Sequence, residues 1–147
     1  MSDQETVLVE VERGFRSPPE QVFDAFLEPA LAGRFLFATP DGEMVRVEID
    51  GRVGGRFVIT ERRAGEDVEH MGEYLDVDRP KRLAFTFSVP KYADTADQVS
   101  IDVVPNEGGC KVSLCHAMPA AYAEYTEQAR EGWGKILDGL AAVLGEI

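Results

Sequence analysis

Apolar and polar residues alternate between residues 70 and 87, on both sides of a short polar segment. Successive side chains of a β-strand point to opposite faces of the sheet, so this alternation is typical of strands with one buried face. The segment from 78 to 82 combines Pro80 with charged residues, which do not extend a buried strand. We therefore predict a β-hairpin whose apolar face is formed by Leu75, Val77, Leu83, Phe85 and Phe87.

A second apolar pattern, near the end of the chain, has the spacing of a helix. It follows Gly132 and comprises Trp133, Ile136, Leu137, Leu140, Val143 and Leu144. Residues three and four positions apart lie on one face of an α-helix, so this stripe predicts an amphipathic helix over about residues 122–144. Because an apolar sheet face and an apolar helix face each need cover, we expect them to bury one another.

The remaining chain is predicted to form strands, with two short helices after the first strand. Alternation between turn residues indicates strands over residues 6–15, 45–49, 55–62, 68–76, 82–89, 98–104 and 111–118. Ser17, two prolines and Glu20 match a capping box, which predicts a helix that ends before Pro29, with a second helix near residues 31–35. No linker or repeat divides the chain, so we expect one α+β domain over residues 1–147.

Four segments of the chain, taken in order, are similar to one known family. They are residues 9–37, the Gly54-Gly55-Arg56-Phe57 element, the G-E-Y-L-D-V-D-x-P-x-x-L-x-F-T-F pattern of residues 72–87, and the G-W-x-x-x-L pattern that ends at Leu137. They resemble the activator of Hsp90 ATPase homologue 1-like branch of the START-like (SRPBCC) superfamily. The resemblance implies a helix-grip (Bet v 1-like) fold, in which a curved antiparallel sheet wraps around the carboxy-terminal helix and leaves a cavity between them. Because this fold hosts lipid carriers, receptors, cyclases and cochaperones, it defines function less narrowly than architecture.

Alternation within the strands selects the side chains that can face such a cavity. The predicted ligand-binding residues are Phe57, Ile59, Glu73, Phe85, Phe87, Leu114, His116 and Trp133. Cavities that bind small molecules are mostly apolar with a few polar groups, as this set is. Phe35, Phe37 and Phe87 stand where relatives often carry tryptophans, so the resemblance does not define the shape of the cavity.

Glu73 is the leading polar candidate, because pairing across the hairpin turn places it on the apolar face of the hairpin. A buried carboxylate needs a hydrogen bond, a cation or a proton, which makes it a contact for a polar ligand group. A register shifted by one residue, or an ion pair with Arg56, would instead give Glu73 a structural role. His116 shares the inward face of its strand with Leu114, and its alternative is a core histidine with a backbone or tyrosine partner.

Three further residues, Glu61, His70 and Tyr92, and the alternatives for Trp133 complete the set of candidates. Glu61 faces inward if its strand is regular, whereas His70 has the opposite face of its strand and is expected near solvent or at a strand end. Trp133 either covers the cavity or only packs in the core. Tyr92 lies in a loop over residues 90–97 that is a candidate flap.

The chain carries 27 acidic and 15 basic residues, which gives a formal net charge of -12. Because phosphate binding requires a basic surface, this charge disfavours a nucleic-acid or anionic-membrane partner. No apolar run approaches the ~20 residues of a membrane span, and residues 1–12 are polar or acidic rather than basic and then apolar. We therefore expect a cytoplasmic protein without membrane insertion.

Residues typical of metal, cofactor or catalytic sites are sparse. Cys110 and Cys115 lie five positions apart, hence on opposite faces of one predicted strand, and His70 and His116 are the two histidines. No phosphate-binding glycine loop, Gly-x-Ser-x-Gly element or His-Glu-x-x-His motif occurs. The sequence predicts no metal and no cofactor, and it favours a non-enzymatic role without deciding it.

Three classes of function are consistent with these observations. The leading hypothesis is binding of a small apolar or amphipathic molecule between the sheet and the last helix. The second, suggested by the resemblance, is a protein-interaction module like the Hsp90-stimulating cochaperone domain, with a chaperone as its partner. The third is a cyclase-like or hydrolytic enzyme that uses polar groups of the cavity. A homodimer through a sheet edge or a helix stays open.

Overall fold

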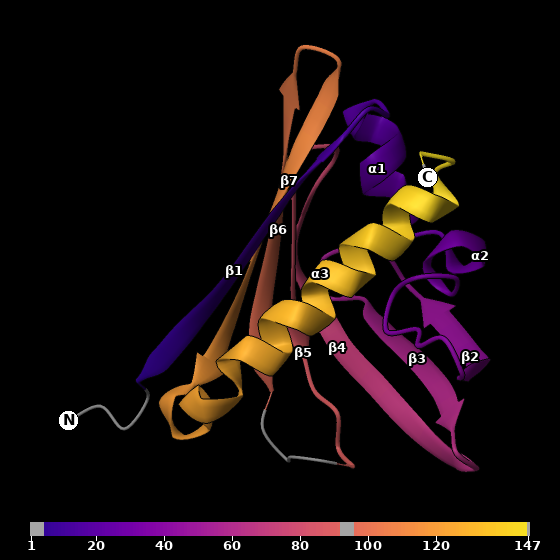
Figure 1. The fold of residues 1–147 in the computed structure, drawn as a ribbon, viewed down its shortest axis with the longest axis vertical. Coiled ribbons are helices and arrows are strands. Elements are labelled where there is room, and N and C mark those ends of the chain that lie inside the picture. The colour runs from indigo at the N-terminus through magenta and orange to yellow at the C-terminus, as the bar shows by residue number, and fades with distance from the viewer. Residues whose placement is uncertain (1–4, 92–95, 147) are drawn as a thin grey trace.

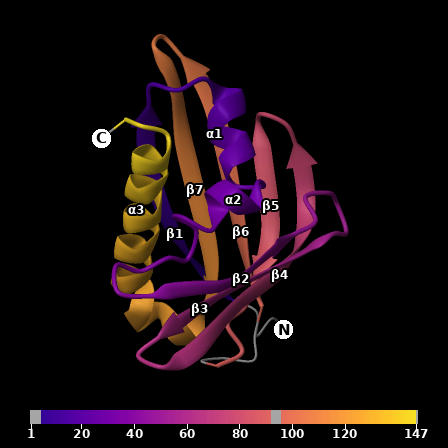
Figure 2. The ribbon, with the colours of Figure 1, turned by 90° about the vertical axis from the view of Figure 1, so that its right-hand side faces the viewer.

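In the computed structural model, which describes residues 5–91 and 96–146, seven strands form one antiparallel sheet in the order β1-β7-β6-β5-β4-β3-β2 (Figure 1). The helices are α1 (Pro19–Ala25), α2 (Pro29–Ala32), the 3-10 helix η1 (Ala120–Tyr125) and α3 (Thr126–Val143). The strands are β1 (Thr6–Phe15), β2 (Glu43–Ile49), β3 (Arg56–Arg63), β4 (Glu66–Asp78), β5 (Arg82–Phe87), β6 (Asp97–Asn106) and β7 (Gly109–Pro119). Because the sheet curves around α3, as Figure 2 shows, the predicted helix-grip architecture is confirmed.

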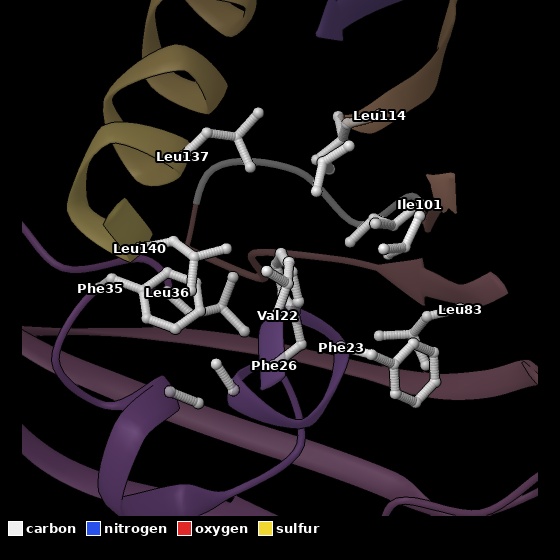
Figure 3. Close-up of a cluster of buried hydrophobic side chains, with 14 of the residues drawn as sticks. Val22, Phe23, Phe26, Phe35, Leu36, Leu83, Ile101, Leu114, Leu137 and Leu140 are labelled. Carbon is white, nitrogen blue, oxygen red and sulfur yellow. The ribbon is translucent and has the colours of Figure 1, made fainter. Parts of the chain in front are cut away.

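Helix α3 closes the apolar core from one side of the sheet. Its buried residues are Trp133, Leu137, Leu140 and Ala141, which confirms that the predicted apolar stripe faces the sheet. Figure 3 shows Leu137 and Leu140 beside core side chains contributed by the strands, by α1 and by the segment after α2. Gly139 allows a close approach, because a Cβ atom at that position would lie 3.1 Å from Cβ of Phe35. None of the described helices is both long enough and apolar enough to span a membrane.

The β4–β5 hairpin contains a bulge that changes which side chains face the core. Tyr74 pairs with Phe85. The next pair joins Asp76 to Ala84, so β4 has one residue more than β5 at this point. An extra residue in one strand inverts the alternation beyond it. Leu75, predicted to be buried, is therefore 42% exposed, whereas Tyr74 is 3% exposed.

The start of α1 is held by the carboxy-terminal end of the chain. Pro18 occupies the N-cap position, and the Ser17 hydroxyl donates to Oε2 of Glu146 (2.6 Å). The backbone N–H groups of Arg16 and Ser17 also donate to the Glu146 carboxylate, at 3.0 and 2.9 Å. The predicted capping box is therefore wrong, because a carboxylate more than a hundred positions away in sequence takes the Ser17 hydroxyl.

Replacing Glu146 by alanine is expected to lower the free energy of unfolding by about 1–3 kcal/mol, because the hydroxyl and the backbone N–H of Ser17, both half-buried, lose their acceptor. Burial disfavours the ionised form of Glu146, but hydrogen bonds from Ser17 and Arg16 outweigh burial and lower the pKa of its carboxyl. The stabilisation by ionised Glu146 should therefore be complete above about pH 5, and it should be lost as the pH falls through the lowered pKa of Glu146 in the folded protein. Urea unfolding measures it, with Glu124→Ala on exposed η1 as the control. Equal stability of all three proteins at pH 7 would contradict the prediction.

Candidate functional site

A cavity of about 500 Å³ opens between the sheet, the middle of α3 and the loop that joins α2 to β2. Its size lies within the range of small-molecule sites. Its lining residues are Phe37, Ala38, Thr39, Pro40, Arg63, His70, Phe87, His116, Ala129, Gly132, Trp133, Lys135 and Ile136. This is the place at which the helix-grip fold was expected to leave a cavity, and aromatic side chains form much of its wall.

Phe37 forms the aromatic wall that faces the sheet. Its ring stacks on His70, with ring centroids 4.6 Å apart and planes 5° from parallel, and on Phe87, at 4.9 Å and 2°. Trp133 of α3 meets the edges of this group, 5.8 Å from Phe37 and 5.9 Å from Phe87. The φ angle of Phe37 is 61°, in the left-handed region that few non-glycine residues adopt, so the surrounding contacts must hold this loop conformation.

A buried carboxylate, that of Glu61, fixes the loop conformation at Phe37. Glu61 is 1% exposed, and it accepts hydrogen bonds from the Thr39 backbone N–H (2.7 Å) and the Thr39 hydroxyl (3.0 Å). It also pairs with Nε of Arg63 (2.5 Å), whose Nη2 donates to the carbonyl of Phe37 (3.2 Å). The carboxylate and the guanidinium thus tie both ends of the Phe37–Thr39 segment to β3.

The environment of Glu61 keeps it ionised. Burial by itself raises the pKa of a carboxyl, but the hydrogen bonds from Thr39 and Arg63 outweigh burial, so the pKa of Glu61 is lowered. Its inward orientation agrees with the alternation in β3. Its role in the structure is to anchor the cavity wall, because its oxygens are already used by Thr39 and Arg63.

His116 is fixed by two partners on different elements. Nε1 of Trp133 lies 3.0 Å from Nδ1 of His116, and Oδ2 of Asp97 lies 2.9 Å from its Nε2. An indole nitrogen only donates, so Nδ1 must be the acceptor and Nε2 must carry the proton that Asp97 accepts. The expected backbone or tyrosine partner is therefore replaced by an indole and a carboxylate. Because both ring nitrogens are bonded, the orientation of the His116 ring is fixed.

His70 lies inside the protein, although the sequence predicted it near solvent. It is 5% exposed, and its Nδ1 lies 3.1 Å from the carbonyl oxygen of Ile59. Since a carbonyl only accepts, Nδ1 carries the proton and Nε2 is the acceptor of the neutral ring. Burial, the largest cause, lowers the pKa of His70 to about 4, so the ring is neutral at pH 7. The prediction was wrong because the β4 bulge inverts the alternation that placed it.

The predicted ligand-binding residues separate into three groups. Phe87, His116 and Trp133 line the cavity. A second group, 0–3% exposed, is buried in the core without lining the cavity, and it consists of Phe57, Ile59, Phe85 and Leu114. Phe57 nevertheless stacks behind Phe37 at 6.2 Å, so this group supports the cavity wall from below.

Glu73 alone forms the third group, and its predicted inward orientation is wrong. It lies opposite Arg56 in the β3–β4 register, next to the pair of Phe57 and Gly72 that faces the core. Neighbouring residues of a strand point to opposite faces, so Glu73 and the exposed Arg56 share the outer face. The structure therefore shows the alternative considered for Glu73, in which the register of its strand is shifted by one residue, and the shift comes from the bulge in β4. Glu73 and His116, the two leading polar candidates, therefore do not share the cavity.

Several lining residues were not among the predicted ones. Phe37, Thr39 and Pro40 come from a loop without periodicity, Arg63 from the end of a strand, and Lys135 from the polar side of α3. The signal for Lys135 was its position two residues after Trp133 on a helix that borders the cavity. Tyr92, the candidate flap residue, lies outside the described residues.

A second hollow of similar size, about 510 Å³, lies where β1 ends and β6 turns into β7. Its lining includes Arg13, Arg16, Glu107 and Glu146. The Glu146 carboxylate there already accepts hydrogen bonds from Arg16 and Ser17. Within residues 5–91 and 96–146, no three His, Cys, Asp or Glu side chains gather in a way that could hold a metal ion.

Comparison with known proteins agrees with the fold. The model of one family, described as Activator of Hsp90 ATPase homolog 1-like protein, matches residues 16–145. A solved structure from Chromobacterium violaceum is 26% identical, with a TM-score of 0.81, over 95% of this chain and 97% of that one. A structure from Rhodobacter sphaeroides is 23% identical, with a TM-score of 0.82, over 99% of this chain and 95% of that one.

A third solved structure, of an AHSA1-like protein from Aeromonas hydrophila, is 23% identical, with a TM-score of 0.80. It covers 95% of this chain and 92% of its own. Among curated proteins, no significant match was found. The structures from Rhodobacter sphaeroides and Aeromonas hydrophila are under 25% identical to this chain, so the likeness to them shows the fold alone.

Proposed function

Because the chain belongs to the activator of Hsp90 ATPase homolog 1-like family, whose fold commonly binds ligands or partners, we propose that it binds a small apolar or amphipathic molecule. The observation that carries this proposal is the 500 Å³ cavity walled by Phe37, Phe87 and Trp133. These rings come from a loop, a strand and a helix, and they meet at a place where the fold separates the sheet from α3.

Burial of the ligand would supply most of the affinity. Each 100 Å² of apolar ligand surface removed from water contributes about 2.5 kcal/mol before the cost of immobilising the ligand. The wall needs little rearrangement for this, because Glu61 and Arg63 already hold Phe37 in place. The enzymatic hypothesis loses one of the polar groups that it would use in the cavity, since Glu73 lies on the outer face. A homodimer and a chaperone partner stay predictions.

Filling the cavity from α3 should weaken ligand binding strongly without harming the fold. Gly132 lines the cavity, and a Cβ atom there would have no heavy atom within 4 Å among the described residues, so Gly132→Phe places a ring at the cavity mouth. The matched control is Gly134→Phe, which also has open space but does not line the cavity. We expect at least a tenfold weaker affinity for Gly132→Phe only, with thermal stability unchanged or raised, because glycine is a poor helix former.

Trp133 makes this experiment direct. It is the single tryptophan of the chain and it lines the cavity, so its fluorescence reports on the ligand. Titrations with naphthalene derivatives and fatty acids, together with native mass spectrometry of freshly purified protein, test the proposal. If no such compound binds at micromolar to millimolar concentration while a chaperone is captured specifically, the interaction hypothesis replaces this one.

A further inference from the structure

The charged side chains that line the cavity are Arg63 and Lys135, and none of the described lining residues is an aspartate or glutamate. We infer that the ligand is an amphipathic monoanion, a carboxylate on an apolar or aromatic body, with its head group bound between Arg63 and Lys135. This inference rests on the proposed function, and it names the chemical class of the ligand. It is the more notable because the chain as a whole has a net charge of -12.

Arg63 is oriented toward this role by its other contacts. Its Nε donates to Glu61 and its Nη2 donates to the carbonyl of Phe37, while no hydrogen bond joins Nη1 to a described residue. The side chain is 31% exposed, so the remaining N–H groups face the cavity and solvent. A guanidinium held in this way loses little conformational freedom when it binds a carboxylate oxygen.

Lys135 supplies the charge that nothing else in the cavity balances. Arg63 is neutralised by Glu61, whereas Lys135 has no ion pair within the part of the chain that the structure describes. It is exposed on α3, where its aliphatic stem can lie along the apolar wall while the ammonium group stays in water. One uncompensated positive charge matches a ligand with one negative charge, which favours a carboxylate over a dianionic phosphate.

The other polar groups of the cavity do not favour a cationic ligand over an anionic one. Both ring nitrogens of His116 are bonded to Trp133 and Asp97, and Asp97 itself does not line the cavity. The neutral His70 ring adds no charge at pH 7. A ligand ammonium would therefore meet two cations and no lining carboxylate, so we expect affinity to fall from acid to amide to amine.

The test compares ligands that share one body and differ in charge. The probes are 2-naphthoate, 2-naphthamide and 2-(aminomethyl)naphthalene, with decanoate and decanamide as an aliphatic pair. Binding is measured by Trp133 fluorescence and by isothermal titration calorimetry at pH 7. We expect the acid to bind about tenfold more tightly than its amide, and the amine to bind more weakly than both.

Two single substitutions locate the charge effect. Lys135→Gln should weaken binding of the carboxylates about three- to tenfold and leave the amides unchanged. The control Lys81→Gln makes the same change of charge at an exposed position in the β4–β5 turn, and it should change neither. Lys135 is exposed, so its substitution tests the head-group contact without endangering the fold.

The outcomes separate the inference from the proposal on which it rests. If the amides bind as tightly as the acids, or if Lys135→Gln weakens both equally or neither, the monoanion assignment is overturned and ligand binding in the cavity stands. If neither acids nor amides bind wild-type protein, ligand binding itself fails, and the assignment fails with it.

Discussion

Replacing Glu61 by alanine is expected to lower the free energy of unfolding by about 3 kcal/mol and to abolish ligand binding. Removing one member of a buried ion pair leaves the other charge uncompensated, which typically costs about 3–5 kcal/mol. We expect the lower end of that range, because Arg63 is 31% exposed and can recover some hydration. The Thr39 donors also lose their acceptor, so the loop that carries Phe37 is released from β3.

The matched control is Asp67→Ala, which breaks the ion pair of Asp67 with Arg62 in the same β3–β4 hairpin. Both of its side chains are 49% exposed, and exposed pairs contribute about 0–1 kcal/mol. Urea unfolding of both variants gives the two free energies. A Glu61→Ala protein that is as stable as the control and binds naphthoate like wild type would show that the buried pair does not hold the cavity wall.

The stability difference between wild type and Glu61→Ala should also depend on pH. The pKa of Glu61 is lowered in the folded protein, so folding favours the ionised form. The contribution is complete above the pKa of the unfolded chain, near 4.5, and it is lost as the pH falls through the lowered folded value. The free energies of unfolding of wild type and Glu61→Ala, measured in urea at a series of pH values, should therefore differ most near neutral pH and become similar in acid.

The architecture could be predicted from the sequence because two apolar patterns specify it. Alternation placed the strands within a few residues of those observed, and the stripe after Gly132 identified the buried face of α3, including Trp133 and Leu137. Both patterns depend on burial against a large apolar surface, which leaves a periodic record in the chain. The short helix α2 was placed slightly late, over 31–35 instead of Pro29–Ala32, because its four residues hold too little periodicity.

The cavity was harder to predict, because local irregularities determine its lining. The bulge between Tyr74 and Asp76 falls at Leu75, where no glycine or proline marks it, and it exchanged the faces assigned to Glu73 and His70. Phe37 reaches the cavity through a left-handed backbone conformation that the sequence does not indicate. Alternation describes regular strands, so it found Phe87 and His116 but not the residues contributed by the loop.

Replacing Trp133 by alanine is expected to lower the free energy of unfolding by about 3–5 kcal/mol, because a large buried side chain leaves a void between α3 and the sheet. Trp133 is 4% exposed and contacts the rings of Phe37 and Phe87, so the aromatic wall loses its support from the helix. Ligand binding should fall with it, as measured by calorimetry, since this variant has no tryptophan fluorescence.

Trp133→Phe separates packing from hydrogen bonding at the same position. Phenylalanine keeps an aromatic ring against Phe37 and Phe87 but cannot donate to Nδ1 of His116, so part of the expected loss comes from smaller volume and about 1 kcal/mol comes from the hydrogen bond. A double-mutant cycle with His116→Phe isolates that second part, because residues in contact show coupling energies of about 0.5–3 kcal/mol. A coupling energy near zero would mean that the Trp133–His116 bond does not position the ring, and that apolar packing alone holds this side of the cavity.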